Sequence, residues 1–277
     1  MASRRDIIRK IAGSITPLYD GREAESIARM VVMDRLSIDF THLATDYDTE
    51  CKIDNLDDVI TDLRRGRPVQ YVLGHAQFCG LDFVVREGVL IPRPETEELV
   101  GQIVAATRTG ARILDVGTGS GAIAVALARM IPDADVEAVD ISDDALAVAV
   151  ENAKRNNVSI KFHKADALGD LGALGRFDAI VSNPPYVPQS DRATMHTNVL
   201  DFEPSEALFV DDANPLVFYR SIAANAAVML ADGGWLWFEI YEKYGDDICR
   251  MLAESGFRDI RLAADANNKP RMVWCRK

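Results

Sequence analysis

From Ala111 onward the sequence alternates between short apolar runs and amphipathic stretches, and this alternation constrains the fold more than any other feature. The apolar runs have the length of strands, whereas the stretches between them space their apolar residues as helices do. The predicted strands are 112–116, 136–140, 159–163, 177–182, 235–240, 257–262 and 271–276. The predicted helices are 121–130, 142–156, 215–230 and 246–254. Strands that alternate with helices form a mainly parallel sheet covered on both faces, so we expect an α/β domain built on a seven-stranded sheet.

The predicted strand 177–182 ends abruptly at the tetrapeptide Asn183-Pro184-Pro185-Tyr186. Two consecutive prolines lack the N–H groups that a sheet ladder needs, so the strand stops there. Ligands of open α/β sheets bind at the carboxyl ends of the strands. The Asn183 side-chain oxygen and the Pro184 carbonyl are therefore candidate acceptors for the N–H groups of a planar amide or amine, whose flat face the Tyr186 ring would cover. A strand-terminating turn without function is the competing interpretation, since Asn and Pro are common in turns.

A glycine-rich turn follows the first predicted strand. Gly117, Gly119 and Gly121 permit a tight turn and let a ligand touch the backbone. Asp140 ends the next strand, where an acid can bind the two hydroxyls of a ribose. The spacing from Gly117 to Ala122 also satisfies the dinucleotide fingerprint. A nicotinamide cofactor therefore competes with S-adenosylmethionine, and a purely structural turn is a third possibility.

Two details favour S-adenosylmethionine. Asp115 lies inside the strand just before the glycines, where it can receive the ammonium group of a ligand. The fourth strand ends in an amide-binding tetrapeptide, whereas hydride transfer would call for an acid-base group. His163 is the only histidine near a strand end in this domain, and it belongs to the third strand. Methyl transfer needs no such base, because the reactive group is already on the cofactor.

The composition narrows the possible partners. A net charge of −12 argues against broad binding to the phosphate backbone of nucleic acids, which needs stripes of lysine and arginine. The four cysteines and four histidines lack the spacing of metal ligands or of a disulfide framework, so we expect no metal site and reduced thiols. No apolar signal region begins the sequence, and no apolar run approaches the ~20 residues that span a bilayer. We therefore expect a cytoplasmic protein without a membrane segment.

The first 73 residues differ from the rest because their pattern is helical throughout. Amphipathic stretches predict helices at 5–15, 21–36 and 56–63. No set of side chains suited to catalysis is visible among them. A small helical domain that binds a partner or covers a site is the expected structure.

A change of pattern follows this helical part. Alternating apolar residues at 77–85, around Gly80, predict a β-hairpin, and Pro94 begins a helix that runs to about residue 107. The expected parts are a helical substrate-recognition domain at 1–73, a β-hairpin linker at 74–92 and a catalytic domain at 93–277.

With these motifs in place, the sequence closely resembles the HemK/PrmC family, the peptide chain release factor glutamine methyltransferases, over nearly the whole chain. The stretches that carry the resemblance are 67–74, 89–97, 115–124, 138–142, 180–186 and 202–204. The tetrapeptide alone also occurs in DNA adenine methyltransferases, but joined to the first two stretches it is specific.

The resemblance implies a class I S-adenosylmethionine-dependent methyltransferase fold, Rossmann-like, preceded by the helical domain. It implies methylation of the glutamine side-chain amide in the Gly-Gly-Gln loop of class 1 release factors, which supports translation termination. The implied partners are these factors, without direct contact to nucleic acid, membrane or metal. The implied cofactor contacts are Gly117, Thr118, Gly119, Ser120, Gly121, Asp140, Asp166, Leu168 and Asn183. The implied catalytic group is Asn183, Pro184, Pro185 and Tyr186.

Two positions depart from the family pattern. The family often has an aromatic residue beside the adenine after the third strand, where this chain has Leu168. The family's Glu-Ile-Gly becomes Glu239-Ile240-Tyr241, which leaves the role of that loop open.

From the residues alone, three other functions compete. An adenine methyltransferase of nucleic acids would use the same tetrapeptide, although the acidic balance of the chain counts against it. A nicotinamide-dependent oxidoreductase would share the glycine turn. A binding module that retains the cofactor without catalysis is the third, and the intact Asn183 argues against it.

Overall fold

The chain forms two compact units in the computed structural model, which describes residues 2–277. The smaller unit comprises the chain up to Gly74 together with His196–Phe202, and the larger unit comprises His75–Met195 and Glu203–Lys277. The sequence predicted a single domain at 93–277. The grouping of His196–Phe202 with the N-terminal helices was not expected.

The smaller unit is helical. Its elements are β1 (Ala2–Ser3), α1 (Arg4–Ile15), α2 (Gly21–Leu36), α3 (Phe40–Thr45), β2 (Glu50–Cys51), α4 (Leu56–Arg64), α5 (Val69–Leu73) and α9 (Thr197–Phe202). Asp20 begins α2, because its side chain accepts the backbone N–H groups of Arg22 and Glu23. Helices α1, α2 and α4 match the predicted stretches. Helices α3 and α5 were not predicted, because with six and five residues they are too short to show a helical period.

The segment His196–Phe202 is held inside this smaller unit by aromatic contacts. The His196 ring stacks on Tyr19 with ring centroids 5.3 Å apart, and its Nε2 lies 3.2 Å from the carbonyl oxygen of Leu18. Phe202 lies against Gly66, where an added Cβ would be 3.9 Å from the ring. A stretch that follows the tetrapeptide in sequence therefore packs among the N-terminal helices.

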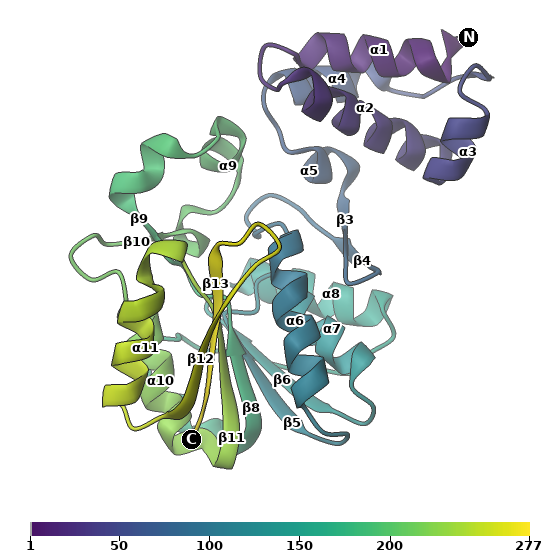
Figure 1. Cartoon of the computed structure of the whole chain (residues 1–277). Helices are drawn as coiled ribbons and strands as arrows, with labels where there is room; N and C mark the ends of the chain where they lie inside the picture. The colour runs from purple at the N-terminus through teal and green to yellow at the C-terminus, as the bar shows by residue number, and fades with distance from the viewer. Residues whose placement is uncertain (1) are drawn as a thin grey trace. The chain divides into compact units, whose positions relative to one another are not determined.

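The larger unit is built on a seven-stranded sheet within residues 2–277 (Figure 1). In spatial order its strands are β12 (Arg258–Ala264), β13 (Pro270–Arg276), β11 (Leu230–Glu239), β8 (Phe177–Ser182), β5 (Arg112–Val116), β6 (Asp135–Asp140) and β7 (Lys161–Lys164). Strand β13 is antiparallel to both of its neighbours, and the other neighbouring strands are parallel. The predicted mainly parallel sheet is confirmed.

Helices cover both faces of this sheet (Figure 1). On one face α6 (Pro94–Ala106) and α7 (Ala122–Met130) share a core with strand residues such as Ile113 and Val136, and α8 (Asp143–Arg155) packs beside α7. On the other face α10 (Val217–Met229) and α11 (Gly245–Glu254) share a core with Leu114 and Ile180. Adjacent residues of one strand thus enter opposite cores, as the pleat requires. The sheet is therefore buried between two hydrophobic cores.

The predicted hairpin is present as β3 (His75–Phe78) and β4 (Leu81–Val84), which pair antiparallel. Asn152 of α8 fastens it to the larger unit. Its Oδ1 accepts the N–H of Val84 at 2.7 Å, while its Nδ2 donates to the carbonyl oxygens of Val84 and Ser120. The hairpin and the glycine turn are therefore joined through one buried amide.

The stretch 187–214, between β8 and α10, contains short elements of regular structure. Directly after the tetrapeptide, β9 (Val187–Pro188) pairs in parallel with β10 (Phe209–Val210). Short 3₁₀ turns occur at η1 (Gly172–Leu174), η2 (Gln189–Thr194), η3 (Ser205–Ala207) and η4 (Glu242–Tyr244). Nowhere in residues 2–277 is there a helix with the length and apolar composition that crossing a membrane requires.

Candidate functional site

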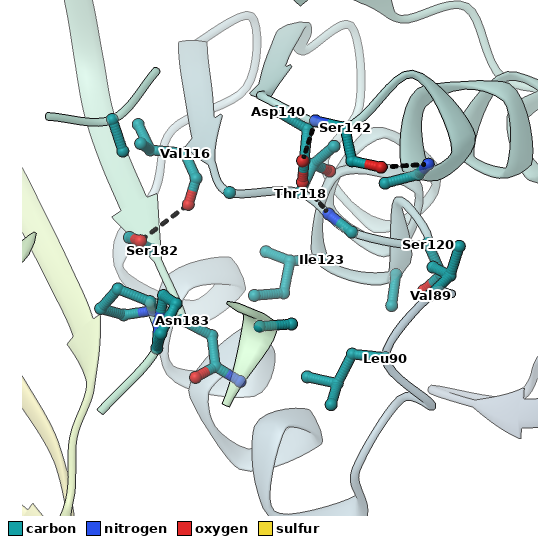
Figure 2. A pocket seen from close by; sticks show the side chains of 18 of the residues that line it. Val89, Leu90, Val116, Thr118, Ser120, Ile123, Asp140, Ser142, Ser182 and Asn183 are labelled. Atoms are coloured by element: carbon teal, nitrogen blue, oxygen red, sulfur yellow. Dashed lines mark hydrogen bonds between the residues drawn. The ribbon is translucent and has the colours of Figure 1, made fainter. Parts of the chain in front are cut away.

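A cavity lies in the larger unit at the carboxyl ends of β5, β6 and β8 (Figure 2). The segments that line it include 88–93, 116–120, 140–142, 165–167 and 182–185. The residues at the carboxyl end of each of these three strands, and those directly after it, line the cavity. This is the edge at which the sequence placed a ligand.

The three glycines of the turn have two different roles. Gly117 and Gly119 line the cavity with φ values of 74° and 55°, and a Cβ added at either would meet no atom within 4 Å. Gly121 does not line the cavity. A Cβ there would lie 3.0 Å from the Cβ of Ala149, so this glycine lets α7 approach α8 closely. Thr118 and Ser120 line the cavity with the first two glycines.

Asp140 lines the cavity at the end of β6. Its Oδ2 accepts the backbone N–H of Gly119 at 2.8 Å, and its Oδ1 accepts that of Ser142 at 2.9 Å. Each carboxylate oxygen keeps a further lone pair. Asp140 is thus oriented by the protein and still able to accept hydrogen bonds from two ligand hydroxyls.

Asp115 lies behind the turn and does not line the cavity. Its Oδ2 accepts the Thr118 hydroxyl at 2.6 Å, while its buried Oδ1 has no hydrogen-bond partner within residues 2–277. Burial raises the pKa of Asp115 to about 7, and the charge of Asp140 contributes to the rise. The Thr118 hydroxyl and the backbone N–H of Ala124 oppose this rise of the pKa, and the carboxyl can still receive a further donor, such as a cationic group or a water molecule.

The segment after β7 meets the cavity through Asp166 and Ala167 but not through Leu168, which is 45% exposed. Oδ1 of Asp166 accepts the Leu168 N–H at 2.8 Å, which closes a turn at this point of the chain. Phe218 and Ile222 of α10 line this part of the wall instead. Neither residue was predicted, because in a sequence the apolar residues of a helix that line a cavity look the same as those that enter a core.

The tetrapeptide is fixed by the residue before it. The Ser182 hydroxyl donates to the carbonyl oxygen of Val116 at 2.7 Å, which ties the end of β8 to β5 (Figure 2). Asn183, Pro184 and Pro185 line the cavity. The Asn183 side chain lies across the cavity from the turn and Asp140 (Figure 2).

Tyr186 is placed differently from the sequence-based expectation. It does not line the cavity, and its hydroxyl donates to Oε1 of Glu239 at 3.1 Å. Burial, with the nearby charge of Glu239, raises the pKa of its phenol. Its ring stacks on Tyr241, with centroids 6.0 Å apart. The Tyr241 hydroxyl in turn donates to Asp191 at 2.5 Å, so the departure from the family's glycine supports Tyr186 from behind.

A family model described as "Methyltransferase small domain" matches residues 95–208. The release factor glutamine methyltransferase of Bacteroides thetaiotaomicron is 42% identical over 267 residues, which cover 95% of this chain and 96% of the relative. That of Flavobacterium psychrophilum is 39% identical over 94% of both chains. This chain belongs to the release factor glutamine methyltransferase family.

A solved structure agrees on the fold of this methyltransferase. The 16S rRNA N2 G1207 methyltransferase of T. Thermophilus, solved in complex with AdoMet and guanosine, has a TM-score of 0.52 and 21% identity. The match covers 73% of this chain and 49% of that one. Membership in a methyltransferase family excludes the oxidoreductase that the glycine turn left open.

Two acidic residues of this methyltransferase were not recognised as parts of the site. Glu203 is buried, and its carboxylate accepts hydrogen bonds from Nη2 of Arg93 at 2.5 Å and from the backbone N–H of Ile91 at 3.2 Å. Glu203 thereby fixes the segment 88–93, which forms one wall of the cavity. Glu239 accepts the Thr96 hydroxyl at 2.6 Å. Glu203 and Thr96 lie in stretches that carried the resemblance, but only the fold pairs them with Arg93 and Glu239.

Proposed function

We propose that this chain transfers a methyl group from S-adenosylmethionine to the side-chain amide nitrogen of the glutamine in the Gly-Gly-Gln loop of class 1 release factors. One observation carries the proposal. The Asn183 amide stands at the end of β8, facing the cavity, opposite a glycine turn open to a ligand. The relatives named above support the choice of substrate, and a cytoplasmic role in translation termination follows from it.

The residues present suit the cofactor. Open space above Gly117 and Gly119 accommodates a ligand against the backbone, and Asp140 offers acceptors for ribose hydroxyls. Asp166, Phe218 and Ile222 form a wall with one acceptor and two apolar surfaces, as an adenine requires. When bound, S-adenosylmethionine supplies a methyl group activated by its sulfonium.

The tetrapeptide is suited to assist attack by the glutamine amide nitrogen. An amide nitrogen is a poor nucleophile because its lone pair is delocalised, and it gains positive charge as it attacks. The Asn183 Oδ1 and the Pro184 carbonyl oxygen would accept its two N–H groups. They would stabilise that charge more in the transition state than in the ground state.

Orientation of the two reacting groups lowers the activation barrier further. Holding the nitrogen in line with the methyl group at ~3 Å removes most of the entropic barrier of a bimolecular reaction. A strong base is unnecessary, since the N-methylated cationic amide is very acidic. We assign Tyr186 to supporting the tetrapeptide, because its hydroxyl faces Glu239.

A methyl-transfer assay tests this function. Purified protein is incubated with S-adenosylmethionine and an intact class 1 release factor, and peptides of the factor are sequenced by mass spectrometry. We expect one methyl group on the glutamine of the Gly-Gly-Gln loop. Methylated adenine in a parallel incubation with DNA, with the factor unmodified, would overturn the proposal.

A matched variant assigns the chemistry to the tetrapeptide. Asn183→Ala should keep the Kd for S-adenosylmethionine within about tenfold of the parent while lowering kcat by ~10² or more, as removal of one transition-state contact does. Near-normal methylation by this variant would rule out the amide clamp. Calorimetry of S-adenosylmethionine and NAD with the parent protein identifies the cofactor independently of activity.

A further inference from the structure

A buried carboxylate, Glu239, is linked through Thr96 to Asn183 of the proposed amide clamp, which consists of Asn183 and Pro184. Glu239 ends β11, is 1% exposed, and accepts two hydroxyl hydrogens. Thr96 of α6 donates to its Oε2 at 2.6 Å, and Tyr186 donates to its Oε1 at 3.1 Å. A carboxylate that faces two donors is stabilised in its ionised, acceptor-only form.

This arrangement dictates the direction of the next hydrogen bond. Thr96 has one hydroxyl hydrogen, and the 2.6 Å contact commits it to Glu239. The Thr96 oxygen has only lone pairs left for Asn183, whose nearest side-chain atom is 3.4 Å away. That atom must be the donor Nδ2, since the oxygen of the amide would repel the lone pairs.

We infer that Glu239, acting through Thr96, sets which end of the Asn183 side-chain amide faces the substrate. This inference rests on the function proposed above. With Nδ2 bound to Thr96, Oδ1 is the end left for the substrate. A glutamine amide brings N–H groups to the cavity, so it needs an acceptor there. A reversed Asn183 would present a donor to a donor. Glu239 and Thr96 are therefore positioning residues of the methyl transfer.

The charge on Glu239 is part of this mechanism. Burial raises the pKa of its carboxyl, and the hydrogen bonds from Thr96 and Tyr186 together with the charge of Arg271 oppose the rise without cancelling it. The titratable and charged groups around it are Glu95 of α6, Tyr186 after β8, Tyr219 of α10 and Arg271 of β13. Protonated Glu239 has a hydrogen to donate to Thr96, which frees the Thr96 hydrogen to turn toward Asn183. Acid should therefore reverse the amide and lower turnover.

Thr96 lies in α6, and Thr107 is the residue directly after this helix, so the two threonines provide a test variant and a matched control. Thr96→Val removes the hydroxyl that links Glu239 to Asn183, and we expect kcat on an intact class 1 release factor to fall ~10-fold or more. The Kd for S-adenosylmethionine should stay within about threefold. Thr96→Ser keeps the hydroxyl and should restore most of the lost turnover. Thr107→Val removes a hydroxyl that has no hydrogen-bond partner in the described chain, and it should match the parent.

A double-mutant cycle separates positioning from general stability. If Thr96 acts through Asn183, Thr96→Val should change kcat by less than about twofold when Asn183→Ala is already present. A loss as large as in the parent would overturn the inference, because it would show an effect that bypasses the amide.

The pH profile tests the role of Glu239. At saturating S-adenosylmethionine and release factor, kcat of the parent should fall as the pH falls through the pKa of Glu239. Glu239→Gln should be slower and should lack this acid limb, with its thermal stability recorded alongside. Parent-like kcat in both Glu239→Gln and Thr96→Val would refute the inference while leaving the proposed function intact. A parent protein that does not methylate the factor would refute the function itself.

Discussion

The backbone N–H of Gly119 donates to Oδ2 of Asp140 at 2.8 Å, so the acid that ends β6 also holds the glycine turn that follows β5. The same carboxylate accepts the N–H of Ser142 at the start of α8. In the proposed function its role is therefore twofold: it would offer lone pairs to the ribose of S-adenosylmethionine, and it holds the turn that would lie beneath the rest of the ligand.

Asp140→Ala should weaken binding of S-adenosylmethionine more than it lowers turnover at saturating cofactor. The Kd should rise at least about tenfold, since each hydrogen bond to a charged group contributes roughly 1.5–3 kcal/mol. Asp140→Asn, which keeps one acceptor, should fall between the parent and the alanine variant. Calorimetric titration measures all three. Asp143→Ala, at an exposed acid on the next helix, is the control and should bind normally. Unchanged affinity in Asp140→Ala would contradict the ribose assignment.

Asp115 should make the ligand-free protein sensitive to pH. Its pKa in the folded chain, about 7, lies above the 3.8 of an unperturbed aspartate, so folding favours the protonated form. The contribution of this group to stability therefore declines as the pH rises from about 4 to about 7. Asp115→Asn should be more heat-stable than the parent at pH 8, with a gap that closes toward pH 4. Differential scanning calorimetry measures the gap, and a gap independent of pH would contradict the prediction.

Gly121 should be required for folding more than for ligand contact. Gly121→Ala places a methyl group 3.0 Å from Ala149 at a φ of 80°, and both effects destabilise. We expect a loss of ~1–3 kcal/mol in unfolding free energy, measured by urea titration. The control is Gly101→Ala inside α6, where an added Cβ meets nothing within 4 Å. That change should be neutral or stabilising by up to about 1 kcal/mol. Equal stability of the two variants would show that the close approach of α7 and α8 is unimportant.

A protein that starts at His75 should test substrate recognition by the smaller unit. It should still bind S-adenosylmethionine but lose tenfold or more in kcat/KM on an intact release factor, with a smaller loss on a short Gly-Gly-Gln peptide. The reason is area, since a stable protein complex buries on the order of 1,200–2,000 Å² and a glutamine loop offers little of it. Equal loss on both substrates would point to a damaged catalytic unit instead.

This truncation needs a specific control. The segment His196–Phe202 would lose Tyr19 and Gly66, its packing partners in the smaller unit. Circular dichroism must therefore show a folded protein before rates are compared. Full-length Tyr19→Ala loosens the same contact without removing the helices, and it should leave peptide methylation near that of the parent.

Local chemistry along the chain was sufficient to predict the sheet and the edge that carries the site. The period of apolar residues distinguishes strands from helices over a few positions. Pro184 and Pro185 end β8 wherever it lies in the sheet, because neither has an N–H to donate. The turn with Gly117 and Gly119 likewise depends on backbone freedom at those residues.

Contacts between distant segments were decided only by the tertiary structure. Thr96 and Glu239 are 143 positions apart, and they meet because α6 packs against β11. Gly121 proved to be a packing residue, Phe218 and Ile222 replaced Leu168 in the cavity wall, and His196–Phe202 joined the N-terminal helices. None of these follows from periodicity or spacing, because propensities act over one or two turns of chain. Strand order and helix packing decide which distant side chains share a hydrogen bond or a wall.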